Sequence, residues 1–491
     1  MSAQPGNAAL EDSALRAELA GDLGAAIAAR RELARLDPRS PLAQLALART
    51  LERAEDWQAA TLAYAEALRR GATGAEIHLR LGNLYLRQSQ HGTALKHLKS
   101  ALADQPENAD AMHSLGQLLH RLRRYRDAAG HLEAAAQRRP DLPQVQFNLA
   151  LARFESGDLR GALDAFAHSH ALSRGAPWSA DPAAELTREH EPQFAGAETS
   201  VNEVKVWHDL EQLEYLLGLG RLPAAFGEVA EQYRALLSEV RGLTGGGIVV
   251  PFNTHRFPLV ARTYKRPVYL DSGVAPRGPA LNPALDTKRL ENQYLRAKPN
   301  VVVVDDLLTR EALDGLRRFC RESTIWNNVQ SGYLGAYFYD GFACELLLRV
   351  GQELRQRFPR LMRDLSLQMA WGYKYDCTLQ GIGVHADAAA VNVNFWLTED
   401  DANLDPEGGG LLIYKHDAPA DWGFAKYNRD PAAILGYLES VGSEPLRVPH
   451  RANRAVIFDS DLFHATDTLR FREGYRNRRI NVTMLYGLRA G

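Results

Sequence analysis

Small apolar residues recur at a fixed spacing along the first third of the chain. With a period of about 34 residues, one column holds only alanine, at Ala26, Ala60, Ala94, Ala128 and Ala162. A second column is also small, with Ala14, Ala48, Gly82, Gly116 and Ala150, and a third is mostly bulky, with Tyr64, Leu98, Leu132 and Phe166. Such a period predicts a stack of helical repeats, each burying its apolar face against the next.

These columns resemble the tetratricopeptide repeat family. In that family small residues lie where two antiparallel helices cross closely, a bulky residue fills the gap, and proline ends a repeat, as Pro38, Pro106 and Pro140 do here. The resemblance implies an all-α solenoid of about five repeats over residues 1–176. It also implies a concave surface that binds an extended peptide or a protein partner, which the sequence does not identify.

Residues 177–296 lack a sustained repeat pattern. The stretch 177–204 is rich in Pro, Ala and Glu and predicts a linker. Apolar spacing returns from Val201 to Arg241, which predicts one or two helices, whereas residues 245–296 contain many Gly and Pro. We interpret the whole stretch as a linker and a helical or irregular connecting region.

The hydrophobic period changes to two in residues 297–491. A helix is predicted from about Thr309, because Leu313, Leu316 and Cys320 share one face. Short β-branched or aromatic runs follow, separated by Gly, Asp and Pro: WGYKYDC, VNVNFWL, GGLLIY, RAVIF and RRINVTMLYG. This pattern is typical of an all-β sandwich or barrel with flanking helices.

Candidate metal ligands lie among these strands. Of the 15 histidines, only His385 begins a His-x-Asp triplet, with Asp387 two positions on, so that both side chains project to the same face of a strand. His464 follows an apolar strand and could supply a second imidazole. Two histidines and one carboxylate leave the opposite positions of a metal open, which suits non-haem iron(II); a zinc hydrolase is the competing use.

The strand after His464 contains a candidate anion-binding residue, Arg479. Its side chain shares one face of the strand with Asn481 and Thr483. With the metal pair and the GGGLLIY strand, this region resembles the double-stranded β-helix 2-oxoglutarate oxygenases, especially their prolyl-hydroxylase-like branch. The resemblance implies a jelly roll in which His385, Asp387 and His464 bind iron(II) and Arg479 binds the far carboxylate of 2-oxoglutarate as a planar pair. Arg476 and Arg478 are close alternatives, although strand alternation favours Arg479.

Further polar residues are weaker candidates. The family often has a tyrosine near the cosubstrate, as at Tyr375, but an aromatic core stripe would give the same pattern. Asn394 is a candidate cosubstrate ligand, because interior asparagines need hydrogen-bond partners that the mouth of a pocket can supply. A long insertion between Asp387 and His464 contains His416, and His450 lies at its end. We interpret these two histidines either as substrate contacts or as surface residues.

The resemblance implies a dioxygenase that uses iron(II), 2-oxoglutarate and O2, forms succinate and carbon dioxide, and hydroxylates an unactivated C–H bond. The repeat array favours a peptide or protein side chain as the substrate, with a small metabolite as the alternative. Asp387 argues against the halogenating members, in which a small residue replaces the carboxylate. A zinc hydrolase and a scaffold protein with a degenerate oxygenase domain are the rival hypotheses.

Composition adds no other function. The formal net charge of -2 gives no global attraction to nucleic acid or to an anionic membrane. No apolar stretch is long enough to span a bilayer and no signal peptide is evident, so we expect a cytoplasmic protein without a membrane partner. The sequence gives no evidence for a nucleic-acid partner and does not exclude one. Cys320, Cys344 and Cys377 show no CxxC spacing and predict neither a disulfide framework nor a thiolate zinc site.

Overall fold

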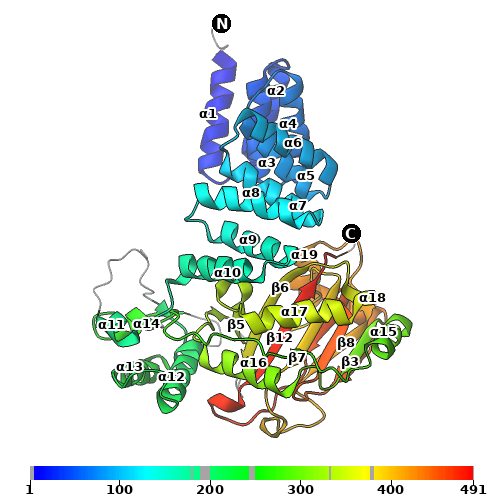
Figure 1. The fold of residues 1–491 in the computed structure, drawn as a ribbon. Coiled ribbons are helices and arrows are strands. Elements are labelled where there is room, and N and C mark those ends of the chain that lie inside the picture. The colour runs from blue at the N-terminus through cyan, green and yellow to red at the C-terminus, as the bar shows by residue number, and fades with distance from the viewer. Residues whose placement is uncertain are drawn as a thin grey trace. The chain divides into compact units, whose positions relative to one another are not determined.

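The chain forms two compact units, Met1–Ser156 and Gly157–Gly491 (Figure 1). The computed structural model describes residues 5–178, 181–187, 200–242, 249–330, 333–375 and 381–489. The division between the units falls between the two helices predicted for the fifth repeat. Cys320 and Cys344 are buried free thiols, and Cys377 lies outside the described residues.

The first unit is a series of antiparallel helix pairs, as the repeat pattern predicts. Its helices are α1 (Pro5–Leu19), α2 (Leu23–Leu36), α3 (Pro41–Arg53), α4 (Trp57–Arg69), α5 (Ala75–Arg87), α6 (His91–Asp104), α7 (Ala109–Arg121), α8 (Tyr125–Arg138) and α9 (Pro143–Ser156). Asp22, Ser40, Asp56 and Asn108 each precede a helix and accept a hydrogen bond from a backbone N–H of its first turn. These polar caps fix where the helices begin.

Small residues mark the points where paired helices cross. The alanine column has no exposed surface within this unit, at Ala26, Ala60, Ala94 and Ala128. A Cβ atom added to Gly82 would lie 2.6 Å from Leu98, and one added to Gly116 would lie 2.5 Å from Leu132. Both leucines belong to the bulky column and are fully buried. The close approach of α5 to α6 and of α7 to α8 therefore depends on glycine having no side chain.

Helix α10 (Leu159–Arg174) opens the second unit and is bound firmly within it. Arg174 at its end donates two hydrogen bonds of 2.8 Å to the carboxylate of Asp340, and the ring of Phe166 contacts that of Phe338. Phe338 and Asp340 belong to a short 3-10 helix, η1 (Phe338–Asp340). The helix that completes the fifth sequence repeat thus packs as part of the second unit.

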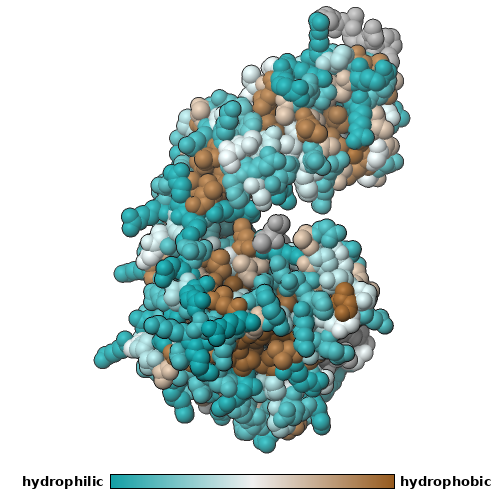
Figure 2. Space-filling model, turned by 90° about the vertical axis from the view of Figure 1, so that its right-hand side faces the viewer, coloured by the Kyte–Doolittle hydropathy of each residue, from teal (hydrophilic) through white to brown (hydrophobic). Residues whose placement is uncertain are grey.

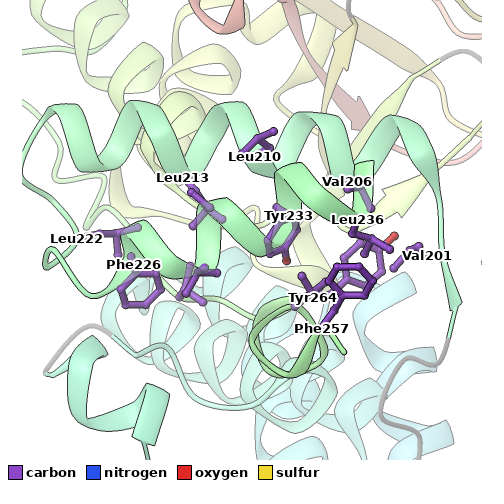
Figure 3. Packing of buried hydrophobic residues seen from close by; sticks show 14 of the residues in the cluster. Val201, Val206, Leu210, Leu213, Leu222, Phe226, Tyr233, Leu236, Phe257 and Tyr264 are labelled. Carbon is purple, nitrogen blue, oxygen red and sulfur yellow. The ribbon is translucent and has the colours of Figure 1, made fainter. Parts of the chain in front are cut away.

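The region between the repeats and the strands contains a hydrophobic core of its own. The elements of this region are α11 (Pro182–Thr187), α12 (Glu203–Gly218), α13 (Phe226–Val240), α14 (Pro258–Thr263), α15 (Thr287–Arg296) and the paired strands β1 (Ser200–Val201) and β2 (Val250–Pro251). Figure 3 shows the side chains of Leu213, Tyr233, Leu236 and Phe257 packed between these helices. The helices predicted between Val201 and Arg241 are therefore present, and they are part of a packed layer.

Two antiparallel sheets form the centre of the remaining part of the second unit. One has seven strands in the order β3-β10-β7-β12-β6-β5-β4, and the other has three in the order β11-β8-β9. The strands are β3 (Val301–Val304), β4 (Asn328–Val329), β5 (Leu334–Tyr337), β6 (Leu367–Tyr375), β7 (Val391–Trp396), β8 (Leu411–Asp417), β9 (Pro445–Val448), β10 (Ala455–Asp459), β11 (Leu462–Thr466) and β12 (Arg479–Tyr486). Each of the five runs predicted as strands supplies one of them.

Helices flank these sheets (Figure 1): α16 (Arg310–Glu322), α17 (Glu345–Arg357), α18 (Pro359–Met362), α19 (Phe424–Arg429) and α20 (Pro431–Ser440). Thr309 caps α16, and Leu313, Leu316 and Cys320 are buried along it, which confirms the predicted helix and its apolar face. Helices α19 and α20 lie in the long insertion between Asp387 and His464.

The face of the chain shown in Figure 2 is largely polar. On the face shown in Figure 2, hydrophilic residues predominate and hydrophobic ones form separate patches. Among the described residues, no helix combines the length and the apolar character needed to cross a bilayer.

The glycine contacts of the first unit lead to a stability prediction. Gly116→Val should destabilise the repeat array by about 1–3 kcal/mol, because the new side chain overlaps Leu132 and forces α7 and α8 apart. Gly130→Val is the matched control, since Gly130 is an exposed helical glycine with no atom within 4 Å of an added Cβ. Denaturation followed by circular dichroism measures both. Equal effects of the two substitutions would contradict the proposed close packing at Gly116.

Candidate metal centre

The two predicted histidine ligands lie opposite each other on antiparallel segments. The backbone N–H of His385 donates to the carbonyl of His464 at 3.0 Å, and the reverse hydrogen bond measures 2.8 Å. Their ring centroids are 4.3 Å apart. This pairing holds both imidazoles on one side of the backbone, and Asp387 joins them because it lies two residues beyond His385.

The three side chains bring their ligand atoms together. One ligand atom from each of His385, Asp387 and His464 lies within 4.8 Å of the other two. Nδ1 of His385 is 2.9 Å from the carbonyl of Gly383, and Nδ1 of His464 is 3.1 Å from that of Leu462. A carbonyl can only accept, so these contacts place the proton of a neutral ring on Nδ1 and leave the Nε2 lone pair free. The donor set therefore fits a divalent transition metal.

The protonation states suit metal binding near neutral pH. Burial, reinforced by the neighbouring His464, lowers the pKa of His385 to about 4. Burial alone would raise the pKa of Asp387, but the nearby imidazoles of His464 and His385 and the hydrogen bond from Asn392 hold that pKa below its ordinary value. His385 thus offers a neutral imidazole, and Asp387 offers a carboxylate.

Asn392 supports the carboxylate, a contact that the sequence pattern did not indicate. Its Nδ2 donates a hydrogen bond of 2.7 Å to Oδ2 of Asp387. The only signal in the sequence is that Asn392 shares a strand face with Asn394. A hydrogen bond of this kind orients a carboxylate ligand and tunes its affinity for the metal.

Arg479 lies in the same cavity as the three ligands. Its side chain is 1% exposed. Its Nε donates to the carbonyl of Gly409 at 2.7 Å, Nη2 to that of Gly410 at 3.2 Å, and Nη1 to Oδ1 of Asn481 at 3.0 Å. Within the described part of the chain, no carboxylate lies at ion-pair distance from this guanidinium. Its charge is therefore buried, and its hydrogen bonds within the described part of the chain go to neutral acceptors.

The two alternative arginines lie elsewhere. Arg478 projects from the opposite face of the sheet, where its Nε donates to the carboxylate of Glu211 on α12 at 2.8 Å. Arg476 is exposed in a short 3-10 helix, η3 (Tyr475–Asn477), just before β12. Of these three arginines, only Arg479 lines the cavity beside His385, Asp387 and His464.

Tyr375 and Asn394 also line this cavity. The ring of Tyr375 lies 4.9 Å from the guanidinium carbon of Arg479, its cross-strand neighbour. Nδ2 of Asn394 donates to Oγ1 of Thr483 at 2.9 Å, while its Oδ1 is buried without a hydrogen-bond partner among the described residues. The structure thus brings together all six residues predicted for the site.

The two histidines associated with the long insertion do not join the site. His450 is buried beside Trp396 and Phe471, so its interpretation as a surface residue is wrong. His416 lies on β8 and is partly buried. Neither lines either cavity near the three ligands. His450 is buried by residues that are distant in the sequence, Trp396 and Phe471, so the residues next to it in the chain could not predict its burial.

Two cavities meet at the candidate centre. The inner one has a volume of ≈20 Å³ and includes Arg479, Asn394 and Tyr375. The outer one has a volume of ≈760 Å³. Both are lined by Trp371, Tyr373, Ile382, His385 and Asp387. A ligand in the outer cavity would therefore be adjacent to the metal ligands.

The supporting role of Asn392 is testable by metal titration. Asn392→Ala should weaken Co²⁺ binding by roughly 10–100-fold, because Asp387 loses the hydrogen bond that orients it. Asn394→Ala is the matched control, since Asn394 lies on the same strand face but bonds to Thr483. Anaerobic titrations followed by visible absorption measure both, with His385→Ala and His464→Ala as variants that should lose binding. Equal affinities of the two asparagine variants would remove the assigned role.

Comparisons with known proteins support the repeats. The tetratricopeptide repeat family profile matches residues 79–143 and 115–177. Among solved structures, a crystal structure of the MamA protein is 19% identical with a TM-score of 0.33, covering 38% of this chain and 98% of that one. MamA from Desulfovibrio magneticus RS-1, from residue 41 to its end, is 19% identical with a TM-score of 0.34, covering 35% of this chain and 97% of that one. YrrB, described as a TPR protein with an unusual peptide-binding site, is 18% identical with a TM-score of 0.31, covering 35% of this chain and 93% of that one. No curated protein matches the chain. The match to the family profile shows that residues 79–177 contain tetratricopeptide repeats.

Proposed function

We propose that residues 297–491 form an Fe(II)- and 2-oxoglutarate-dependent dioxygenase that hydroxylates a peptide or protein side chain recruited by the repeats. The observation that carries this proposal is the buried Arg479, which forms no ion pair with any described carboxylate and lies in the same cavity as His385, Asp387 and His464. We interpret the two antiparallel sheets as the two layers of a double-stranded β-helix.

A buried cation without an anion is costly, which supports an anionic ligand beside Arg479. Its three hydrogen bonds use three of the five N–H donors of a guanidinium and leave one on each terminal nitrogen. Two such donors suit a bidentate contact with a carboxylate. 2-Oxoglutarate carries a carboxylate at each end, so one can meet Arg479 while the other approaches the metal ligands. Because the inner cavity measures only ≈20 Å³, side chains lining it would have to move apart when the cosubstrate binds.

His385, Asp387 and His464 would hold iron(II). When bound, the metal supplies the activation of O2 that couples decarboxylation of 2-oxoglutarate to succinate with oxidation of a C–H bond. The chain itself supplies orientation and exclusion of water. Arg479 fixes the far end of the cosubstrate, Asn392 orients Asp387, and the rings of Trp371 and Tyr373 cover the side toward the outer cavity.

Two rival hypotheses receive less support. A zinc hydrolase commonly uses a second carboxylate as a general base, but Asp387 is the only carboxylate among the described residues that line the two cavities. A scaffold with a degenerate oxygenase domain would have no reason to keep Arg479 buried without an ion pair to any described carboxylate, because that arrangement costs stability. A small metabolite remains the alternative substrate.

The proposal predicts succinate formation that depends on Arg479. The wild-type protein should form succinate from 2-oxoglutarate under air with Fe(II). Arg479→Gln should raise the 2-oxoglutarate concentration needed by about 10- to 100-fold, since a hydrogen bond to a charged group is worth about 1.5–3 kcal/mol. Arg476→Gln is the control, because Arg476 is exposed and outside the cavity. Succinate release and equilibrium binding of 2-oxoglutarate provide the two measurements.

Three outcomes separate the rival functions. Unchanged 2-oxoglutarate affinity in Arg479→Gln would contradict the assigned anion site. Hydrolytic activity with Zn²⁺ and no requirement for O2 would favour the hydrolase. Metal and 2-oxoglutarate binding without any succinate, even with candidate peptides present, would favour the scaffold.

Recruitment by the repeats predicts that chemistry and substrate capture can be separated. A protein containing residues 157–491 should keep metal and 2-oxoglutarate binding, because α10 and its Arg174–Asp340 contact are retained. It should lose most hydroxylation of its protein substrate. Thermal melting first checks folding, and mass spectrometry then follows incorporation of isotopically labelled O2 into proteins of a cell extract. An unaltered labelling pattern would exclude recruitment and favour a small metabolite.

A further inference from the structure

Aromatic side chains form one wall of the outer cavity. Its lining includes Tyr333, Tyr337, Trp371 and Tyr373 beside His385 and Asp387. Its volume of ≈760 Å³ lies within the usual range for small-molecule sites, about 300–1,000 Å³. The wall therefore contributes to what can reach the proposed metal.

The rings of this wall contact one another. Their centroids lie 4.1 Å apart for Tyr333 and Tyr373, 5.7 Å for Trp371 and Tyr373, and 6.1 Å for Tyr337 and Tyr373. At these separations no space remains between them for a cation, so they do not form an aromatic cage. The hydroxyl oxygens of Tyr337 and Tyr373 are 3.2 Å apart. The wall thus offers apolar ring surface together with phenol hydroxyl groups.

Arg429 gives the outer cavity its positive charge. It is the only lysine or arginine among the described lining residues, and Asp387, the metal ligand, is the only carboxylate. The Arg429 guanidinium carbon lies 5.2 Å from the centroid of the Phe424 ring. Arg429 is exposed, and the described residues offer it no ion pair. Its charge is therefore available to a ligand.

The segment that carries Arg429 is bonded to the backbone between two metal ligands. The N–H of Ala386 donates to the carbonyl of Tyr427 at 2.9 Å, and Nδ2 of Asn428 donates to the carbonyl of Ala386 at 2.8 Å. The guanidinium carbon of Arg489 lies 4.1 Å from the Tyr427 ring centroid. These contacts hold the backbone that carries Arg429 close to the segment of His385 and Asp387.

We propose that the outer cavity selects its substrate by a carboxylate group. Arg429 binds the carboxylate, and the apolar part of the substrate lies against Trp371 and the tyrosine rings, near the metal ligands. A glutamyl or aspartyl side chain and a free small acid share this chemistry, whereas a basic substrate would be repelled. The inference rests on the proposed function for the oxidation of the bound substrate, whereas binding of the carboxylate by Arg429 does not depend on that function.

Matched probes test the charge preference directly. The ligands are an N-acetylated, C-amidated tripeptide with a central glutamate, its glutamine counterpart, and free glutarate. Titrations followed by tryptophan fluorescence use the full chain loaded with Co²⁺ and saturating 2-oxoglutarate, so that the acids cannot occupy the site at Arg479. The wild-type protein should bind the glutamate peptide at least 10-fold more tightly than the glutamine peptide, and salt should reduce the difference.

Arg429→Ala should abolish this preference, and Lys426→Ala should retain it. Lys426 is the matched control because it lies on the same helix and over an aromatic ring, 4.1 Å from the centroid of Trp422, but does not line the cavity. Stronger binding of the peptide than of glutarate would identify a protein substrate, and the reverse would identify a small acid.

The inference and the proposed function fail in different ways. No charge preference in the wild-type protein, or an equal preference in Arg429→Ala, would overturn the inference while metal and 2-oxoglutarate binding persisted. If 2-oxoglutarate did not bind, the proposed function would fail. The same titrations without metal or cosubstrate would then still test the carboxylate preference at Arg429.

Discussion

The register of β12 between its two neighbours sets the composition of the candidate site. Arg479 pairs with Tyr375 on β6, and Thr483 pairs with both Trp371 on β6 and Asn394 on β7. Because side chains alternate along a strand, this register collects the polar residues of three strands on one face. A slip of one residue would turn Arg479, Asn481 and Thr483 together away from the cavity, because it moves every side chain of the strand to the other face.

The same strands explain why the connecting helices belong to the second unit. The face away from the cavity carries Lys374 on β6 and Arg478 just before β12, and both are buried. Lys374 donates to the carbonyl of Cys320 at 3.1 Å, while Arg478 bonds to Glu211 on α12. Helix α12 thus covers the reverse side of the strands that form the site. A change in its packing would reach the cavity through β6 and β12.

Local periodicity could predict the repeat helices, the five strands and the faces of Arg479, Tyr375 and Asn394, because each depends on spacing within one element. Contacts between distant segments could not be predicted in this way. The hydrogen bond from Asn392 to Asp387 depends on how β7 meets the ligand segment, and that from Asn428 to Ala386 spans about 40 residues. The packing of α10 within the second unit could not be predicted either, because its sequence follows the same repeat pattern as the helices of the first unit.

Two buried cations on neighbouring strands show why Arg479 in particular requires an anion. Lys374 is surrounded by a carbonyl, the hydroxyl of Tyr475 and the ring of Trp326, and burial holds its pKa well below the ordinary value. A lysine in such a place can lose its proton and become neutral. Burial also lowers the pKa of Arg479, but from so high a starting value that the guanidinium stays charged. No described carboxylate forms an ion pair with it, so an anionic ligand would compensate its charge, and the cavity that it shares with His385, Asp387 and His464 is where that ligand would bind.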